Sequence, residues 1–389
     1  MEVERPKKIQ HREADKNEED IISDLSDCVL IHILSFLNIK EVVQTCILSK
    51  RWINLWKKLS TLTLSTSDFK TNENLEKFAS QLLSLRDHST ALSDLRLYAN
   101  HLASASPFQK TIEYAVSHNV KHLLVNLAAI EHFPSCFFSC LTLTTLNLSA
   151  YNIFFNFGRT IIFPDFFNLP ELTTLSLKYF TFCGTNDGCV EPFSGFNKLN
   201  TLIIDRCEVF GAKKNLRISS TKLVNLTIHM YGCDSKKYSK TSFGIELYYA
   251  PSLNAFAFTG GECIQELSGS ESVLSFIKHV NIHLPYCWNL RENSLILLNW
   301  LVQLANIESL IISSKTLKVL SYYPDLLKVK FDSFCNLKTL KIKMDGPHGP
   351  SSIPQGMLDF LLQNSPSAKV DFINLFIRPV ASVNKAVGC

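Results

Sequence analysis

Apolar residues recur with two different spacings along the chain, and the change of spacing divides it. Residues 1–19 are polar, carry both charges and lack an apolar run, so they predict a disordered leader and no secretory signal. Residues 20–59 place apolar side chains at helical spacing, and the residues beyond them alternate as in short strands. The pattern predicts a small helical unit followed by a long strand-rich region.

The helical unit contains three predicted helices. The first carries one apolar stripe, made of Leu25, Val29, Leu30, Ile33, Leu34 and Leu37. Ser26 and Asp27 offer N-capping side chains at its start, and Asn38 can cap the second helix. The second and third helices carry Val42, Val43, Cys46, Ile47, Leu48, Trp52, Leu55 and Trp56. Such short helices cannot bury all of these faces alone, so the unit needs a partner, either the rest of the chain or another protein.

The strand-rich region repeats one short pattern. Residues 92–100 read LSDLRLYAN and match the leucine-rich-repeat core LxxLxLxxN at every fixed position. Related apolar triplets follow at steps of 23 to 30 residues, close to the period of this repeat class. They begin at Leu92, Val120, Leu143, Leu172, Leu199, Leu223, Leu253, Ile277, Ile307 and Leu337, and Leu59/Leu62/Leu64 is a candidate entering copy. The region therefore predicts a solenoid of stacked repeats.

Each triplet predicts a strand whose alternate side chains point into the solenoid, where the neighbouring repeats bury them. The motif expects asparagine or cysteine eight residues after its first apolar residue, which we call its eighth position. Asn100 and Cys207 comply, whereas Ala128 and Tyr151 do not. The repeats are thus degenerate. The predicted fold class is α/β: an N-terminal three-helix unit followed by an irregular leucine-rich-repeat solenoid, a horseshoe with a parallel concave sheet.

The helical unit also resembles a known family. Residues 25–37 read LSDCVLIHILSFL, and residues 43–56 read VQTCILSKRWINLW. This sequence resembles the F-box of flowering-plant F-box/leucine-rich-repeat proteins, and residues 133–138 (FPSCFF) are similar to that family too. Residues 363–367 (QNSPS) resemble the start of the FBD segment that many members carry, which we expect here to be truncated or absent. The expected domains are a leader (1–19), an F-box (20–59), a leucine-rich-repeat domain with a truncated FBD-like end (60–375) and a tail (376–389).

The resemblance implies a function. The F-box of this family binds a Skp-type adaptor, which joins cullin and RING subunits, and the repeats bind a substrate protein for ubiquitination. The chain would then be a non-enzymatic substrate receptor that raises the effective concentration of its substrate near a ubiquitin-conjugating enzyme. The alternative is an interaction scaffold with a degenerate F-box outside any ligase. Its support is Ser26, because the family usually has proline there; we expect weaker adaptor binding, not its loss.

Candidate contact residues come from both regions. An exposed apolar helical face fits a partner's groove. The predicted adaptor contacts are Leu25, Val29, Leu30, Ile33, Leu48 and Trp52, although about half of them are expected to pack within the helical unit instead. Outward positions of the strands would line the concave face, and the predicted substrate-binding residues are Arg96, Tyr98, His122, Asn147, Lys178, Asp205, His229 and Lys341.

Composition excludes several other classes of protein. A net charge of +4 over 389 residues is too small to indicate a nucleic-acid partner. The longest apolar stretch, residues 295–304, is too short to span a membrane. Twelve scattered cysteines without a CxxC pair are typical of a reduced intracellular protein, and we expect it in the nucleus, the cytoplasm or both.

The sequence also offers no catalytic or metal-binding pattern. The concave positions show no paired carboxylates and no nucleophile beside a base, so we expect no enzymatic activity. His279 and His283 share a strand face but lie about 13 Å apart, too far to bind one metal ion. Seven lysines between Lys315 and Lys343 indicate a solvated basic rim, with an anionic ligand in the horseshoe as the alternative. No cofactor is expected.

Overall fold

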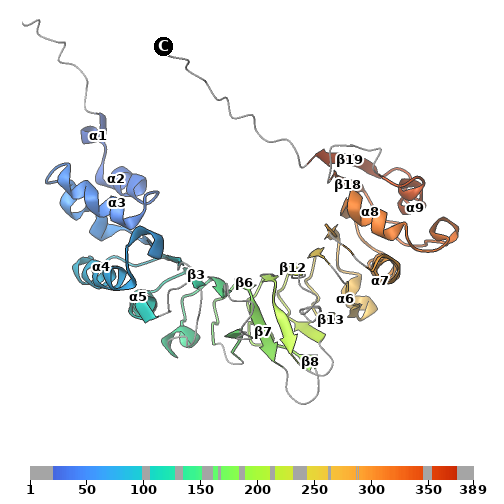
Figure 1. Cartoon of the computed structure of the whole chain (residues 1–389), viewed down its shortest axis with the longest axis horizontal. Helices are drawn as coiled ribbons and strands as arrows, with labels where there is room; N and C mark the ends of the chain where they lie inside the picture. The colour runs from blue at the N-terminus through green and yellow to red at the C-terminus, as the bar shows by residue number, and fades with distance from the viewer. Residues whose placement is uncertain are drawn as a thin grey trace, which may run out of the picture.

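The structure, a computed structural model, shows a curved solenoid with a small helical unit at its N-terminal end (Figure 1). It describes residues 21–98, 106–127, 135–150, 161–164, 168–183, 189–210, 215–230, 243–261, 264–285, 287, 289–344 and 353–374. The predicted leader (1–19) and tail (376–389) lie outside these residues, as do Asn100, Ala128 and Tyr151. The domain boundaries predicted above therefore stay predictions.

The helical unit contains short helices whose ends differ from the prediction. They are α1 (Ile21–Asp24), α2 (Asp27–Leu34), α3 (Ile39–Gln44) and the 3₁₀ helices η1 (Thr45–Ile47) and η2 (Trp52–Lys58). Asn38 caps α3 as predicted, in a reciprocal capping box with Glu41. Ser26 occupies the N-cap position of α2 but makes no capping hydrogen bond with its side chain. Asp27 instead forms an ion pair of 2.9 Å with Arg51, which ties the start of α2 to the start of η2.

The repeats form one parallel sheet on the concave side of the arc. In the described part of the chain, its twelve strands follow the order β1-β2-β3-β4-β6-β9-β12-β14-β16-β17-β18-β19. Their bounds are β1 (Thr61–Ser65), β2 (Asp94–Tyr98), β3 (His122–Leu127), β4 (Thr145–Ala150), β6 (Thr174–Lys178), β9 (Thr201–Asp205), β12 (Asn225–Met230), β14 (Ala255–Gly260), β16 (His279–His283), β17 (Ser309–Ser313), β18 (Thr339–Met344) and β19 (Lys369–Asn374). The predicted horseshoe with a parallel concave sheet is confirmed.

The predicted triplets form the core of this solenoid. Every triplet residue, from Leu59 to Ile342, is at most 4% exposed. The second and third members of each triplet pair with their counterparts in the next strand, as Leu95 does with Leu123 and Leu97 with Val125. Cys207 is buried, and its thiol donates to the carbonyl of Leu177, as the motif requires of its eighth position. Burial in apolar surroundings raises the pKa of this thiol to about 12.

The twelfth strand, β19, was not predicted. Its Phe372 pairs with Ile342 of β18 and so continues the row of core residues, but Phe372 is 45% exposed. Ser367 stands where the pattern expects the first apolar residue of a triplet. The apolar-triplet pattern therefore does not predict this strand.

The outer side of the arc is covered by helices and two smaller sheets (Figure 1). One sheet contains β5 (Ile161–Ile162), β7 (Phe180–Cys183) and β10 (Glu208–Phe210), and the other contains β8 (Cys189–Val190), β11 (Asn215–Ser219), β13 (Gly244–Tyr249) and β15 (Leu267–Gly269). The helices are α4 (Asn72–Leu85), α5 (Ser106–Ser117), α6 (Glu271–Leu274), α7 (Leu290–Gln303), α8 (Ser314–Leu320) and α9 (Met357–Leu361). Near the centre, the rings of Phe163, Phe182 and Phe193 pack behind the sheet, with Phe163 and Phe182 meeting edge to face at 5.5 Å.

A buried arginine joins the helical unit to the solenoid. Arg86, at the end of α4, is 2% exposed. Its guanidinium donates to the carbonyl of Leu59 at 2.6 Å, to that of Thr90 at 2.8 Å and to that of Ala91 at 3.1 Å. Because Leu59 ends the helical unit and the other two carbonyls precede β2, one side chain fixes both segments. The two parts also share one hydrophobic core.

Candidate functional site: an apolar helical surface and a polar concave face

The helical unit exposes large apolar side chains. Ile47 is 88% exposed and Phe36 is 76% exposed. With them, the apolar surface of the helical unit contains Ile21, Ile22, Val29, Ile33, Leu37, Leu48 and Ile53, all of which are exposed. Soluble proteins rarely expose so many large apolar groups in so few residues unless a partner covers them.

The six predicted adaptor contacts divide into three groups. Val29, Ile33 and Leu48 belong to the apolar surface, whereas Leu25 and Trp52 are half-buried against the core. Leu30 is fully buried, so its prediction as a surface contact is wrong. It lies on the inner side of α2, where it packs in the core that the helical unit shares with the solenoid.

The sequence reasoning missed Ile21, Ile22, Phe36, Leu37, Ile47 and Ile53 as contacts. Helical periodicity predicts an inward stripe that extends to Leu37, but α2 ends at Leu34. The second helix likewise ends at Gln44, before Ile47. Once the chain leaves the helix, the periodicity no longer directs these side chains inward. Helix ends predicted at Leu34 and Gln44 would have indicated that Phe36, Leu37 and Ile47 are exposed.

The concave face presents rows of side chains across adjacent strands. Arg96, Asn147 and Lys341 belong to a middle row, which the strand registers connect from β1 to β19. His122 lies in the row on the N-terminal side of it. Tyr98, Lys178, Asp205 and His229 belong to the row at the carboxyl ends of the strands. None of these eight predicted substrate-binding residues is buried, so all remain available for contact.

Three of these residues come together at the centre of the arc. Lys178, Asp205 and His229 occupy the same position on β6, β9 and β12, which are neighbours in the sheet. The ammonium of Lys178 lies 3.0 Å from the carboxylate of Asp205. Tyr98 is separated from Lys178 by two intervening strands, and Lys341 lies beyond β14, β16 and β17 from His229. The structure therefore does not bring those two residues to the same place.

Two residues next to these strand ends were not predicted. Tyr179 and Arg206 directly follow β6 and β9, with positive φ angles of 63° and 52°. Their backbone N–H groups donate to the carbonyls of Asp205 and His229, at 3.0 and 2.8 Å. Arg206 Nη1 donates to the Tyr179 hydroxyl at 2.6 Å. The five residues Lys178, Tyr179, Asp205, Arg206 and His229 form what we call the central charged cluster.

The cluster perturbs the histidine within it. The pKa of His229 lies below its ordinary value of 6.5, chiefly because burial disfavours the charged imidazolium. The positive charges of Lys178 and Arg206 lower it further, whereas Asp205 acts in the opposite direction. His229 is therefore neutral at neutral pH, and the charges of the cluster are those of two cations and one carboxylate.

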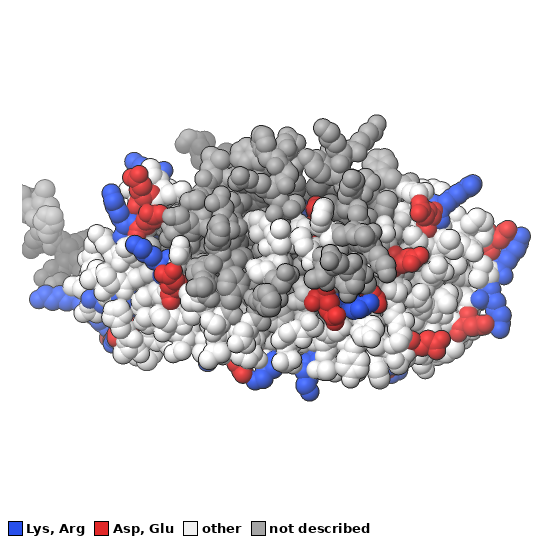
Figure 2. All heavy atoms as spheres, turned by 90° about the horizontal axis from the view of Figure 1, so that it is seen from below, with Lys and Arg blue, Asp and Glu red and all other residues white. Residues whose placement is uncertain are grey.

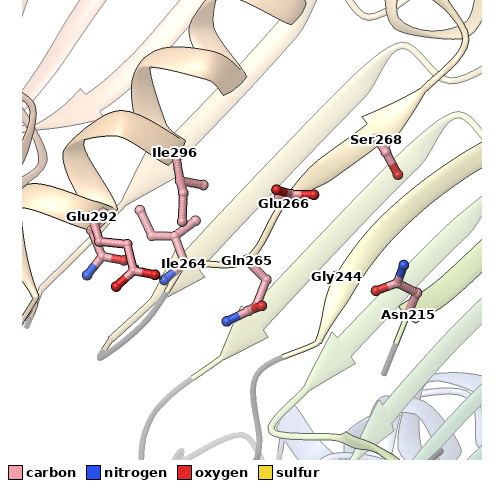
Figure 3. Close-up of a pocket in the computed structure, with 9 residues that line it drawn as sticks. Asn215, Gly244, Ile264, Gln265, Glu266, Ser268, Glu292 and Ile296 are labelled. Carbon is pink, nitrogen blue, oxygen red and sulfur yellow. Dashed lines mark hydrogen bonds between the residues drawn. The ribbon is translucent and has the colours of Figure 1, made fainter. Parts of the chain in front are cut away.

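A cavity of about 250 Å³ lies on the outer side of the solenoid (Figure 3). Its polar lining includes Glu266, which precedes β15, and Glu292 of α7. Nearby, the N–H of Ile264 donates to Asn293 Oδ1 at 2.9 Å, and Asn289 donates to the Glu292 carboxylate. The first of these hydrogen bonds holds α7 against the segment before β15, and the second lies within the first turn of α7. In the described residues, no group of three or more His, Cys, Asp or Glu side chains is arranged to hold a metal ion.

The outer face also carries mixed charge. Lysines, arginines and carboxylates alternate over both ends of the described part of this face (Figure 2). Ion pairs of 2.6 Å, Lys198–Glu171 and Lys338–Glu308, also join segments that precede neighbouring strands of the main sheet. No helix within the described ranges has the length and apolar character needed to span a membrane.

Comparison with known proteins bears on both surfaces. Residues 22–63 match the F-box domain. An FBD-associated F-box protein of Arabidopsis thaliana is 26% identical over 347 residues, which cover 84% of this chain and 70% of the relative. A second such Arabidopsis protein is 26% identical over 367 residues, 90% of this chain and 71% of the relative. Arabidopsis F-box/LRR-repeat protein 13 is 25% identical over 390 aligned residues, with 88% and 80% covered.

The helical surface and the curved sheet together define a class of protein. An F-box domain at the end of a leucine-rich-repeat solenoid makes the chain an F-box/leucine-rich-repeat protein. Over most of its length the chain is similar to Arabidopsis FBD-associated F-box and F-box/leucine-rich-repeat proteins.

Proposed function

We propose that the chain is the substrate receptor of an SCF-type ubiquitin ligase. The apolar surface of the helical unit binds a Skp-type adaptor, which brings in cullin and RING subunits, and the concave face binds the substrate protein. The observation that carries the proposal is the exposure of Phe36, Ile47 and Leu48 on an F-box domain whose inner side is already packed on the solenoid. This apolar surface is thus left for another protein.

In the proposed mechanism, the chain tethers the substrate to the adaptor and catalyses no reaction itself. Because the helical unit and solenoid share one core, adaptor and substrate are held at a fixed separation. A fixed separation raises the effective concentration of the substrate beside a ubiquitin-conjugating enzyme. The proposal includes no catalytic residue in this chain, and it places the protein in the nucleus, the cytoplasm or both.

The experiment is a binding titration of the full chain with a purified Skp-type adaptor. Leu48→Asp is expected to weaken binding at least about tenfold, because burying a leucine side chain contributes roughly 1.5–3 kcal/mol and a buried charge adds a penalty. Leu141→Asp is the matched control, since Leu141 is equally exposed, at 63%, but lies before β4 on the solenoid. Equal loss of binding in both variants, or no complex with the unsubstituted chain at micromolar concentration, contradicts the proposal.

A second function has one supporting observation. Ser26 leaves the N-cap of α2 without a side-chain hydrogen bond, where family members usually carry proline. A degenerate F-box of this kind would leave the chain as an interaction scaffold outside a ligase. The same titration decides between the two functions, because the scaffold forms no adaptor complex.

A further inference from the structure

Among the described strand residues of the concave face from β4 to β14, charge is confined to the central charged cluster. From β4 to β14, the middle row contains Asn147, Ser176, Ile203, Thr227 and Ala257. The row on its N-terminal side contains Thr145, Thr174, Thr201, Asn225 and Ala255. These side chains are short, except for Ile203. The described centre of the arc is thus a shallow, mainly neutral floor with charge at the carboxyl ends of three strands.

Within the cluster, the cations are more accessible than the carboxylate. The side chains of Lys178 and Arg206 are 38% and 42% exposed, whereas that of Asp205 is 20% exposed. Asp205 lies 3.0 Å from Lys178 and 3.8 Å from Arg206, so one recessed carboxylate holds two cations side by side. A molecule approaching the concave face meets the two positive groups first.

A tyrosine ring orders both cations. Lys178 lies 5.3 Å from the centre of the Tyr179 ring, and the Arg206 guanidinium lies 5.6 Å from the same ring. Tyr179 and Arg206 hold backbone conformations that cost residues other than glycine roughly 1–3 kcal/mol each. The cross-strand hydrogen bonds from their N–H groups offset part of this cost. Ordered side chains lose less entropy on binding.

We propose that the central charged cluster binds the carboxylate of an aspartate or glutamate in an acidic segment of the substrate, which lies across β6, β9 and β12. This inference rests on the proposed function, in which the concave face binds the substrate. The substrate carboxylate contacts Lys178 and Arg206, and the adjoining residues of the segment lie on the neutral floor around Ile203 and Thr227. Two cations and one carboxylate leave one net positive charge, which matches a carboxylate better than a doubly charged phosphate.

The test uses an array of immobilised dodecapeptides of random sequence, incubated with the full chain. The unsubstituted protein is expected to select peptides rich in aspartate or glutamate. Arg206→Gln and Lys178→Gln are each expected to reduce binding of the selected peptides at least fivefold. Arg206→Glu is expected to shift the selection toward peptides that contain lysine or arginine, which loss of folding cannot produce.

The chain offers a matched control on its outer side. Arg217 of β11 pairs with Glu246 at 3.1 Å and lies 4.8 Å from the centre of the Tyr248 ring, so it has the same chemistry away from the concave face. Arg217→Gln is expected to leave the peptide selection unchanged. Selected peptides that are not acidic, no peptide binding, or equal effects of Arg206→Gln and Arg217→Gln would overturn the inference. So would stronger binding of the same peptides with phosphoserine at the acidic positions.

Adaptor binding, measured on the same variants, keeps this inference separate from the proposed function. Arg206→Gln is expected to bind the adaptor normally and to lose the acidic selection. Leu48→Asp is expected to do the reverse. If the unsubstituted chain binds the adaptor but selects no acidic peptides, the substrate class is contradicted. If it selects acidic peptides but forms no adaptor complex, the ligase function is contradicted.

Discussion

At the scale of single residues, two apolar residues of the same row can be buried to very different extents. Ile342 and Phe372 are paired partners in the same core row, yet Ile342 is fully buried and Phe372 is 45% exposed. The pKa of His229 is lowered chiefly by burial, and further by Lys178 and Arg206 beside it. The sequence shows which row a residue belongs to, but its burial and its pKa depend on the residues around it in space.

Core truncation tests this difference. Ile342→Ser is expected to lower the free energy of unfolding by about 3–5 kcal/mol, because it removes buried apolar volume and buries a hydroxyl. Phe372→Ser is expected to cost less than about 2 kcal/mol, since water already reaches the ring. Urea unfolding followed by circular dichroism measures both values. Equal losses would mean that Phe372 is covered as fully as Ile342.

The histidine in the cluster predicts a pH dependence. Its pKa is lower in the folded chain than the ordinary value of 6.5, so its neutral form stabilises the fold above that pH. This contribution is lost as the pH falls below 6.5, because the imidazole must then take up a proton beside two cations. The melting temperature of the unsubstituted chain should therefore fall more steeply between pH 7 and pH 5 than that of His229→Gln. Parallel melting curves at every pH would exclude this role.

At the scale of the elements, helix ends decide which apolar residues reach solvent. The end of α2 at Leu34 leaves Phe36 and Leu37 outside the helix, and the end of α3 at Gln44 leaves Ile47 outside. Strand ends have a similar effect, because Tyr179 and Arg206 leave the sheet in left-handed conformations beside Asp205. Some residues of both candidate surfaces therefore lie just beyond the ends of helices and strands.

The start of α2 offers a test at this scale. Ser26 has φ −67° and ψ 155°, values that proline adopts without strain, and its own side chain makes no capping bond. Ser26→Pro is expected to raise the free energy of unfolding by about 0.4–1 kcal/mol by restricting the unfolded chain. Under the proposed function it should also tighten adaptor binding, as measured by calorimetry. A destabilised variant would show that the serine contributes in another way.

At the scale of the whole molecule, the F-box domain closes one end of the solenoid. Leu62 and Leu64 of β1 are buried, in the same core that contains Val42 and Trp56 of the helical unit. At the other end, β19 leaves Phe372 exposed. The apolar surface of the helical unit and the concave face are thus parts of one packed body, as the proposed tether of fixed length requires.

Arg86 tests that coupling. Arg86→Met leaves the carbonyls of Leu59, Thr90 and Ala91 without this donor, and it is expected to cost about 3 kcal/mol in the free energy of unfolding. Lys198→Met removes an exposed ion pair with Glu171 instead and should cost less than about 1 kcal/mol. Urea titration measures both losses. Similar small effects would show that apolar packing alone joins the two parts.

The sequence by itself determined the spacing of the repeats, where they begin, and which strand residues form the rows of the concave face. Apolar triplets fix which side of each strand is buried, since a shift by one residue would turn every side chain over. Capping by Asn38 could also be predicted, because it depends on residues close in the chain. The F-box domain followed from a sequence resemblance over residues 25–56.

Only the tertiary structure decided which predicted residues act together. Leu30 and Val29 are adjacent in sequence, yet one is buried and the other exposed, because η2 packs against one side of α2. Tyr179 and Arg206 lie 27 positions apart in the sequence and meet only because β6 and β9 pair in register. Whether a side chain is exposed, and which other side chains it contacts, depends on segments far apart in the sequence. No local pattern contains that information.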